Sequence, residues 1–392
     1  MKEKLIKIIS SKQILIIIFA LLALVASIQP ILSGPTTNNN GEIKYNKYNN
    51  YTIFQNSYNH LKSGKDLYAL YPEESWDLFK YTPTFSVFFG IFAIFPDWLG
   101  LTLWNLVNAL LLLFAVYYLP KLSNLEKGLV LIILLIELLT SMQNGQSNAL
   151  IAGLLVFSFG LLEKNKYILA TLLIVFSAFI KLFGIVGFAL LLFYPEKWKL
   201  ALYTTLWTIV LFLLPLLFID TSQYYELLGS YWNMLSNDHS VSYGYSVMGW
   251  LNTWFGIHIN KNIIVIIGAV IFLIPLIYIK LYNNFMFKYL ALTSILIWVV
   301  IFNHKAESPT FIIAITGVAL WFIKSKKSNI NIILFVMAFI LTSLSPTDIF
   351  PQFLREEYVQ TYTLKAFPCI LIWLKINYDM LRLADNNKYN SG

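Results

Sequence analysis

The sequence predicts an all-α fold, a polytopic bundle of transmembrane helices, and three observations predict it. Of 392 residues, 58% are hydrophobic and only 12% are charged, whereas roughly 25% are charged in soluble domains. The apolar residues gather into thirteen runs, and a helix of about 20 such residues crosses a bilayer. Short Lys-rich clusters separate these runs. We therefore expect one domain over residues 1–392, integral to the cell (inner) membrane.

The runs predict about twelve spans and one re-entrant helix. Run 13–33 follows a Lys-rich start and exceeds the apolar part of a signal peptide, so we expect an uncleaved first span. Run 83–96 has about 14 residues and opens with Pro83, which predicts a re-entrant or interfacial helix. The remaining runs predict spans at 98–119, 128–143, 147–162, 167–180, 184–194, 199–220, 262–280, 287–303, 308–324, 329–346 and 362–378. Runs 167–180 and 184–194 are short for full crossings, and half-helices are the alternative there.

The Lys-rich clusters predict the orientation of the spans. Short loops rich in Lys and Arg face the cytoplasm, which places both termini and most basic loops inside. Three long segments then face outward, at 34–82, 221–261 and 347–361. The net charge of +8 arises from these scattered clusters, so membrane lipids are expected partners and nucleic acid is not.

The first outer segment contains several candidate polar residues. Glu42 and Asp77 are carboxylates that can accept hydroxyl hydrogen bonds or act as a base. Lys80 and Tyr81 follow Asp77 where the chain enters the apolar run, and aromatic rings stack on sugar faces. Simple solvation of these side chains is the alternative.

Two polar positions lie near the membrane surface. The turn 143–148 joins two runs, and its Gln146 and Asn148 amides can bind hydroxyls or phosphate oxygens. Lys181 lies between two apolar runs, where an ammonium needs an anionic partner. A lipid phosphate would serve, and a structural pair with Glu137 is the alternative.

A third polar cluster follows the run 287–303. His304, Lys305 and Glu307 bring a proton-transfer group, a cation and a carboxylate within a few residues, although they could also simply cap a span. The four histidines lie far apart in the sequence and none pairs with another at helical spacing, so we expect neither a metal site nor a cofactor.

The order of these motifs resembles family-87 glycosyltransferases of the membrane-embedded C-type superfamily. The motifs are Gly64-x-x-Leu67-Tyr68, Lys80-Tyr81-x-Pro83, Trp104-Asn105-x-x-Asn108, Gly145-Gln146-x-Asn148 and Lys181, and the resemblance covers roughly residues 13–310. It implies a C-type bundle that transfers a sugar, typically mannose, from a polyprenyl-phosphate donor to a lipid or glycan acceptor on the non-cytoplasmic face.

The resemblance also implies a general base that this sequence lacks at the usual place. The family has an Asp early in the first outer loop, and counting back from Gly64 leads to Asn49, Asn50 and Tyr51. An amide cannot accept a proton at neutral pH. Either another carboxylate, Asp77 or Glu42, has taken the role, or the chain has lost the usual chemistry.

The implied reaction gives the remaining candidates roles as substrate ligands. Lys181, with Lys80 or Lys305, would hold the donor phosphate, and the amides of the 143–148 turn and His304 would bind hydroxyls or phosphate oxygens. A transporter or flippase of lipid-linked sugar is the first alternative, but the polar groups cluster on one side and no paired halves occur. A non-catalytic member of the family is the second.

Overall fold

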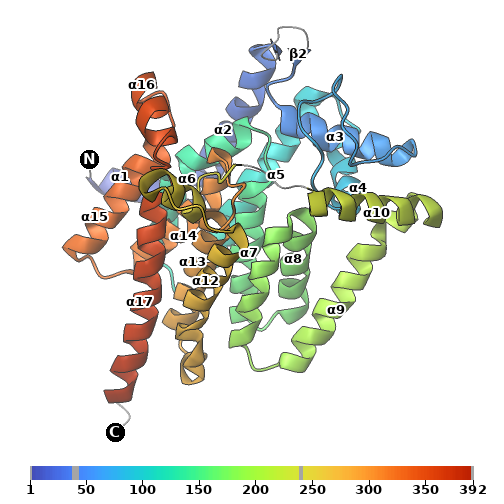
Figure 1. Ribbon diagram of the computed structural model, residues 1–392. Coiled ribbons are helices and arrows are strands. Elements are labelled where there is room, and N and C mark those ends of the chain that lie inside the picture. Colours follow the sequence, from blue (N-terminus) through green and yellow to red (C-terminus); the bar gives the residue numbers. More distant parts are fainter. Residues whose placement is uncertain (1, 38–43, 238–241, 390–392) are drawn as a thin grey trace.

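The computed structural model describes residues 2–37, 44–237 and 242–389, and within them the molecule is nearly all-α (Figure 1). The all-α prediction is therefore confirmed. In chain order, the first helices are α1 (Lys2–Ser10), α2 (Lys12–Leu32), α3 (Asn49–Lys62), α4 (Pro83–Ala93), α5 (Asp97–Tyr118), α6 (Asn124–Gln143), α7 (Asn148–Glu163), α8 (Tyr167–Ile180) and the 3₁₀ helix η1 (Leu182–Phe193). A short antiparallel ribbon, β1 (Thr36–Thr37) and β2 (Lys44–Tyr45), precedes α3.

The second half of the chain continues the bundle. Its elements are α9 (Lys197–Leu213), η2 (Leu214–Leu217), α10 (Thr221–Asn237), α11 (Val247–Phe255), α12 (Lys261–Leu273), η3 (Pro275–Ile277), η4 (Ile279–Leu281), α13 (Phe285–Ile301), η5 (Ser308–Thr310), α14 (Phe311–Lys324), α15 (Asn329–Ala338), η6 (Phe339–Leu344), α16 (Gln352–Leu354), η7 (Arg355–Gln360) and α17 (Phe367–Tyr389). All thirteen apolar runs are mostly helical. Helices α3, α10 and α11 also form in segments predicted only as outer loops, so these loops are more ordered than the sequence analysis expected.

Local sequence signals explain where several helices begin. Thr82 caps α4 by accepting a hydrogen bond from the Phe85 amide, and Pro83 stands at the first helical position, where its missing N–H costs nothing. A capping box formed by Ser123 and Glu126 starts α6. Two helices of the core approach closely at Gly153 of α7, where an added Cβ would lie 3.0 Å from the Leu112 amide nitrogen of α5.

Part of the predicted membrane topology is visible in the helix lengths. Of the described helices, three are long and apolar enough to cross a membrane, namely Lys12–Leu32, Asp97–Tyr118 and Lys197–Leu217, and eight more apolar helices have 10–17 residues. The segment Lys197–Leu217 exposes large apolar side chains including Leu202, Leu206 and Ile209, as expected of a helix that faces lipid. The twelve crossings and the re-entrant character of α4 stay predictions.

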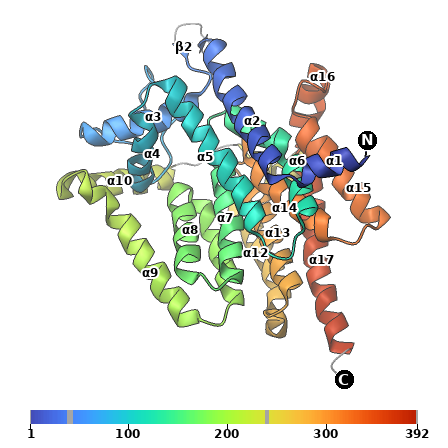
Figure 2. The same cartoon turned by 180° about the vertical axis from the view of Figure 1, so that it is seen from behind.

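The Lys-rich loops meet at one end of the bundle. Lys288 at the start of α13 pairs with Glu163 at the end of α7, and Lys324 lies 2.7 Å from Glu126. Lys121, before α6, lies over the Phe285 ring. Helix α17 begins nearer the other end, and Figures 1 and 2 show its last turns at the foot of the bundle. Which end faces the cytoplasm stays a prediction.

Candidate functional site

The turn between α6 and α7 is held in one conformation by its neighbours. Gly145 has φ +60°, which favours glycine, and an added Cβ would lie 3.1 Å from the Tyr51 amide nitrogen. The Trp104 indole N–H donates to the Gly145 carbonyl at 3.0 Å. Helices α3 and α5 therefore fix this turn, and with it the positions of Gln146 and Asn148.

Lys181 lies against this turn at the break between α8 and η1. Its ammonium donates to Gln146 Oε1 at 3.1 Å and to Asn148 Oδ1 at 2.9 Å, and it lies 5.5 Å from the centre of the Tyr81 ring. Within the described part of the chain, no carboxylate lies within salt-bridge distance of this ammonium. Tyr81, the 143–148 turn and Lys181, which are far apart in sequence, are thus brought together, and the close hydrogen-bond partners of the cation are neutral.

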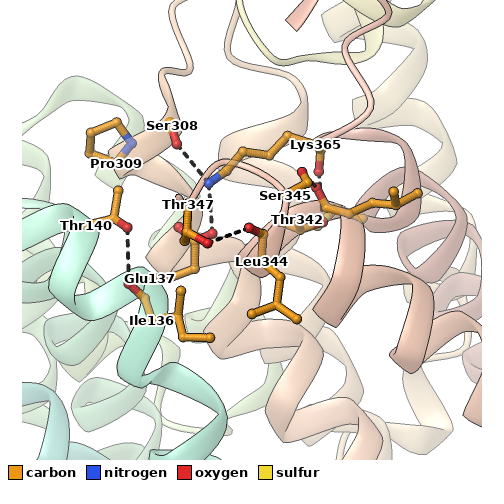
Figure 3. Close-up of polar contacts among 12 residues, drawn as sticks. Ile136, Glu137, Thr140, Ser308, Pro309, Thr342, Leu344, Ser345, Thr347 and Lys365 are labelled. Carbon is orange, nitrogen blue, oxygen red and sulfur yellow. Dashed lines mark hydrogen bonds and ion pairs between the residues drawn. The ribbon is translucent and has the colours of Figure 1, made fainter. Parts of the chain in front are cut away.

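The alternative partner for Lys181, Glu137, is occupied elsewhere. Glu137 of α6 pairs with Lys365, just before α17, at 2.7 Å, and both side chains are only 1% exposed. Figure 3 shows the Lys365 ammonium between Glu137 and the Ser308 hydroxyl, to which it donates at 2.9 Å. A Lys181–Glu137 pair is therefore wrong. The sequence analysis missed Lys365, although an ionisable residue inside the apolar run 362–378 was an available signal.

The segment 302–310 joins the two lysine environments. The Asn148 side-chain N–H donates to the Pro309 carbonyl at 3.0 Å, while Ser308 contacts Lys365. Glu307 is exposed and close enough to Lys181 to interact with it electrostatically. The third polar cluster therefore borders the Lys181 cluster, so the two can belong to a single site.

His304 and Lys305 lie near different charged residues. Burial lowers the pKa of the His304 imidazole, and the nearby Lys261 charge lowers this pKa further, so the neutral ring is favoured. Burial also lowers the pKa of Lys305, and the charge of Lys80 acts in the same direction. Lys80 and Lys305 thus lie near one another at the rim of the site.

The two proposed carboxylate bases differ in what the structure says of them. Asp77 pairs with Lys80 at 2.8 Å and accepts a hydrogen bond from the Leu78 amide at 2.8 Å, so its carboxylate already has partners. Glu42 lies outside the described residues. Asn50, where the family resemblance leads one to look for an Asp, donates from its amide to the Asn144 carbonyl at 2.9 Å, which places the start of α3 against the 143–148 turn.

An apolar pocket opens beside Lys181. It measures about 310 Å³ and is lined by residues of α4, α8, η1, α9 and α10, among them Pro83, Phe179, Leu182, Ile185, Phe212 and Leu228. The Thr82 hydroxyl donates to the Phe179 carbonyl at 2.5 Å, tying α4 to the end of α8. Leu182, which lines the pocket, follows Lys181 directly, so the pocket borders the break between α8 and η1 where Lys181 lies.

These features define a helical membrane protein whose polar centre lies beside an apolar pocket at one end of the bundle. The model of glycosyltransferase family 87 matches residues 79–302, more than half of the chain, and the chain belongs to this family. The matched part includes Lys80, Tyr81, the 143–148 turn and Lys181, whereas Glu307 and Lys365 follow it. Comparison with curated proteins gives no match.

Proposed function

We propose that this glycosyltransferase transfers a sugar, with mannose as the first to test, from a polyprenyl-phosphate carrier to a lipid or glycan acceptor on the non-cytoplasmic face. The position of Lys181 is the observation that carries the proposal. Its ammonium has only neutral amide oxygens as hydrogen-bond partners among the described residues, and a cation between two apolar helices calls for an anion. The phosphate of a membrane lipid supplies one.

The apolar pocket supports a lipid carrier rather than a soluble sugar nucleotide. Its lining comes from five helical elements and is almost wholly apolar, as a site for isoprenoid chain requires. With the chain in this pocket, the phosphate would reach Lys181, and the cations Lys80 and Lys305 lie near one another at the rim.

In the reaction, an acceptor hydroxyl attacks the anomeric carbon while the bond to the phosphate oxygen breaks. The electron pair leaves with the phosphate, and direct displacement inverts the anomeric centre. Lys181 would stabilise the charge that develops on the leaving phosphate, and fixed charges of this kind act strongly where water is excluded. Gln146 and Asn148 hold the ammonium in place for this role.

The decisive experiment follows sugar transfer by purified full-length protein in lipid nanodiscs. Radiolabelled polyprenyl-phosphate mannose is the donor, and a membrane glycolipid extract supplies the acceptor. We expect labelled product from the wild type and a loss of about 100-fold or more in K181A, the scale for removing one charge-stabilising donor. K62A is the matched control, because Lys62 lies on α3 over the Tyr58 ring and should leave transfer unchanged. Unchanged transfer by K181A would refute the phosphate role.

One observation favours a second candidate, a non-catalytic lipid-sugar-binding subunit. The position near Asn50 carries an amide and lies against the site, and an amide cannot serve as the base. Donor binding by the wild type without turnover, abolished in K181A, is the result this candidate predicts.

A further inference from the structure

A polar pocket is lined in part by Glu307 and shares no lining residue with the apolar pocket. It measures about 380 Å³ and is formed by α11 with the residues before it, by residues 306–308 and by residues 360–363. A second pocket of about 290 Å³ shares Tyr245, Ser308 and Gln360 with it and extends to Arg355 and Glu356. Two of the three outer segments predicted from the sequence, 221–261 and 347–361, thus contribute to one hollowed region.

This pocket is firmly joined to the 302–310 segment. The Tyr245 amide donates to the Ala306 carbonyl at 2.9 Å, and an added Cβ on Gly244 would lie 2.8 Å from the carbonyl oxygens of His304 and Ala306. The residues before α11 are therefore held against the segment that carries Glu307, which also lines the pocket.

The lining has the chemistry that recognises hydroxyl groups. Asn252, Gln360 and Thr253 offer amide and hydroxyl groups, which can both donate and accept hydrogen bonds. Tyr245 adds an aromatic ring of the kind that packs against the apolar face of a sugar. The apolar pocket of the donor side has no comparable set of amides.

Glu307 is the carboxylate that connects this pocket with Lys181. Its side chain is exposed, it lines the polar pocket, and it interacts electrostatically with Lys181. Among the described residues, no hydrogen bond or ion pair engages its carboxylate, whereas Asp77 is paired with Lys80 at 2.8 Å. Unlike the paired Asp77, the Glu307 carboxylate is therefore open to a substrate within the described part of the chain.

We propose that the polar pocket holds the acceptor, a sugar-bearing molecule, and that Glu307 is the general base that removes the proton from its attacking hydroxyl. This inference rests on the proposed function. The acceptor oxygen forms the new bond to the anomeric carbon, its proton passes to the Glu307 carboxylate, and the carrier phosphate leaves with the bonding pair towards Lys181. The base thus comes from the segment after α13 instead of the first outer loop.

The test compares E307Q, D77N and Q360A in the nanodisc assay with polyprenyl-phosphate mannose and the glycolipid extract. In E307Q we expect kcat to fall by about 100-fold or more, within the range for a general base, with an unchanged Kd for polyprenyl phosphate. In Q360A we expect the KM for the extract to rise roughly tenfold, the effect of one lost hydrogen bond. D77N tests the rival base directly.

A matched control comes from another polar pocket on the outer side. Asn233 of α10 lines a pocket with Asp66 and Ser230. Helix α16 directly precedes η7, which contains Gln360, and Figures 1 and 2 show α10 and α16 at opposite sides of the molecule. N233A should leave KM for the extract unchanged. Loss of transfer in D77N with full transfer in E307Q would overturn the base, and a raised KM in N233A instead of Q360A would overturn the pocket.

Failure of the proposed function gives a different result. Binding of a radiolabelled glycolipid extract to the nanodisc protein is measured as well. A wild type that transfers no mannose but binds this extract more tightly than Q360A shows that the pocket is right and the donor wrong. Equal retention by wild type and Q360A contradicts the pocket whether or not transfer occurs.

Discussion

Two lysines near the same end of the bundle meet opposite kinds of partner. Lys365 is 1% exposed and lies 2.7 Å from the Glu137 carboxylate, whereas Lys181 is partly buried and donates to two neutral amide oxygens. A buried cation with a carboxylate beside it is already neutralised and can serve only the fold. A cation held by dipoles keeps its charge for an incoming anion, so the difference separates a structural lysine from a substrate-binding one.

The two lysines are nevertheless linked through one segment of chain. Lys365 donates to Ser308 at 2.9 Å, and the next residue, Pro309, accepts a hydrogen bond from Asn148 at 3.0 Å. The other side-chain bond of Asn148 reaches Lys181. The buried pair thus anchors the segment that borders the site, and it should influence transfer only through that segment.

The largest effect that tests this contrast is on stability. Replacing Glu137 by Leu leaves Lys365 buried without its carboxylate, and loss of one partner from a buried pair costs about 3–5 kcal/mol. We expect the free energy of unfolding of E137L, measured in mixed micelles, to fall by this amount. K181M should lose less, because it breaks two hydrogen bonds to neutral amides and leaves no charge buried without a partner.

The double variant E137L/K365M supplies the control for this prediction. Removing both charges of a buried pair is often neutral or stabilising, so its unfolding free energy should return towards that of the wild type. A double variant as unstable as E137L would mean that the packing of Glu137, not its charge, stabilises the bundle.

A second prediction gives Lys181 the kind of partner that Lys365 has. Asn148→Asp places a carboxylate where Oδ1 now accepts at 2.9 Å, which would neutralise the ammonium and repel a phosphate. We expect transfer to fall by about 100-fold, as when one charge-stabilising donor is lost. The measurement is kcat/KM for polyprenyl-phosphate mannose.

Asn148→Ala is the matched control for this substitution. Neither Asp nor Ala can donate to the Pro309 carbonyl, as Asn148 does, so the difference between the two variants isolates the added charge. Equal activities for N148D and N148A would show that Lys181 does not act through its charge, and the contrast with Lys365 would lose its functional meaning.

The sequence predicted the helices and the members of the Lys181 cluster, but not their pairing. Hydrophobic runs and Lys-rich loops depend on local composition, so the thirteen helical runs could be found from the chain alone. Gln146, Asn148 and Lys181 were found because polar groups in apolar surroundings stand out. Their assembly depends on contacts that no local pattern encodes.

Glu137 shows where sequence reasoning failed. It was considered as a partner for Lys181 because both occupy apolar surroundings, yet the fold brings it to Lys365, 228 positions further along the chain. Helices in a bundle can pair in many orders, and composition does not choose among them. The polar pocket was equally hidden, because it forms only where residues 242–253, 306–308 and 360–363 meet.

The smallest expected effect concerns the ion pair at the rim of the site. Lys80 and Asp77 lie 2.8 Å apart, but their side chains remain 34% and 47% exposed. Solvent screens such a pair, which contributes about 0–1 kcal/mol. We expect K80M to change the unfolding free energy by less than about 1 kcal/mol, against about 3–5 kcal/mol for E137L in the same micelles. A loss in K80M as large as that in E137L would show that water screens the Lys80–Asp77 pair as little as the Glu137–Lys365 pair. Side-chain exposure would then not distinguish charged groups that stabilise the bundle from those available to a substrate.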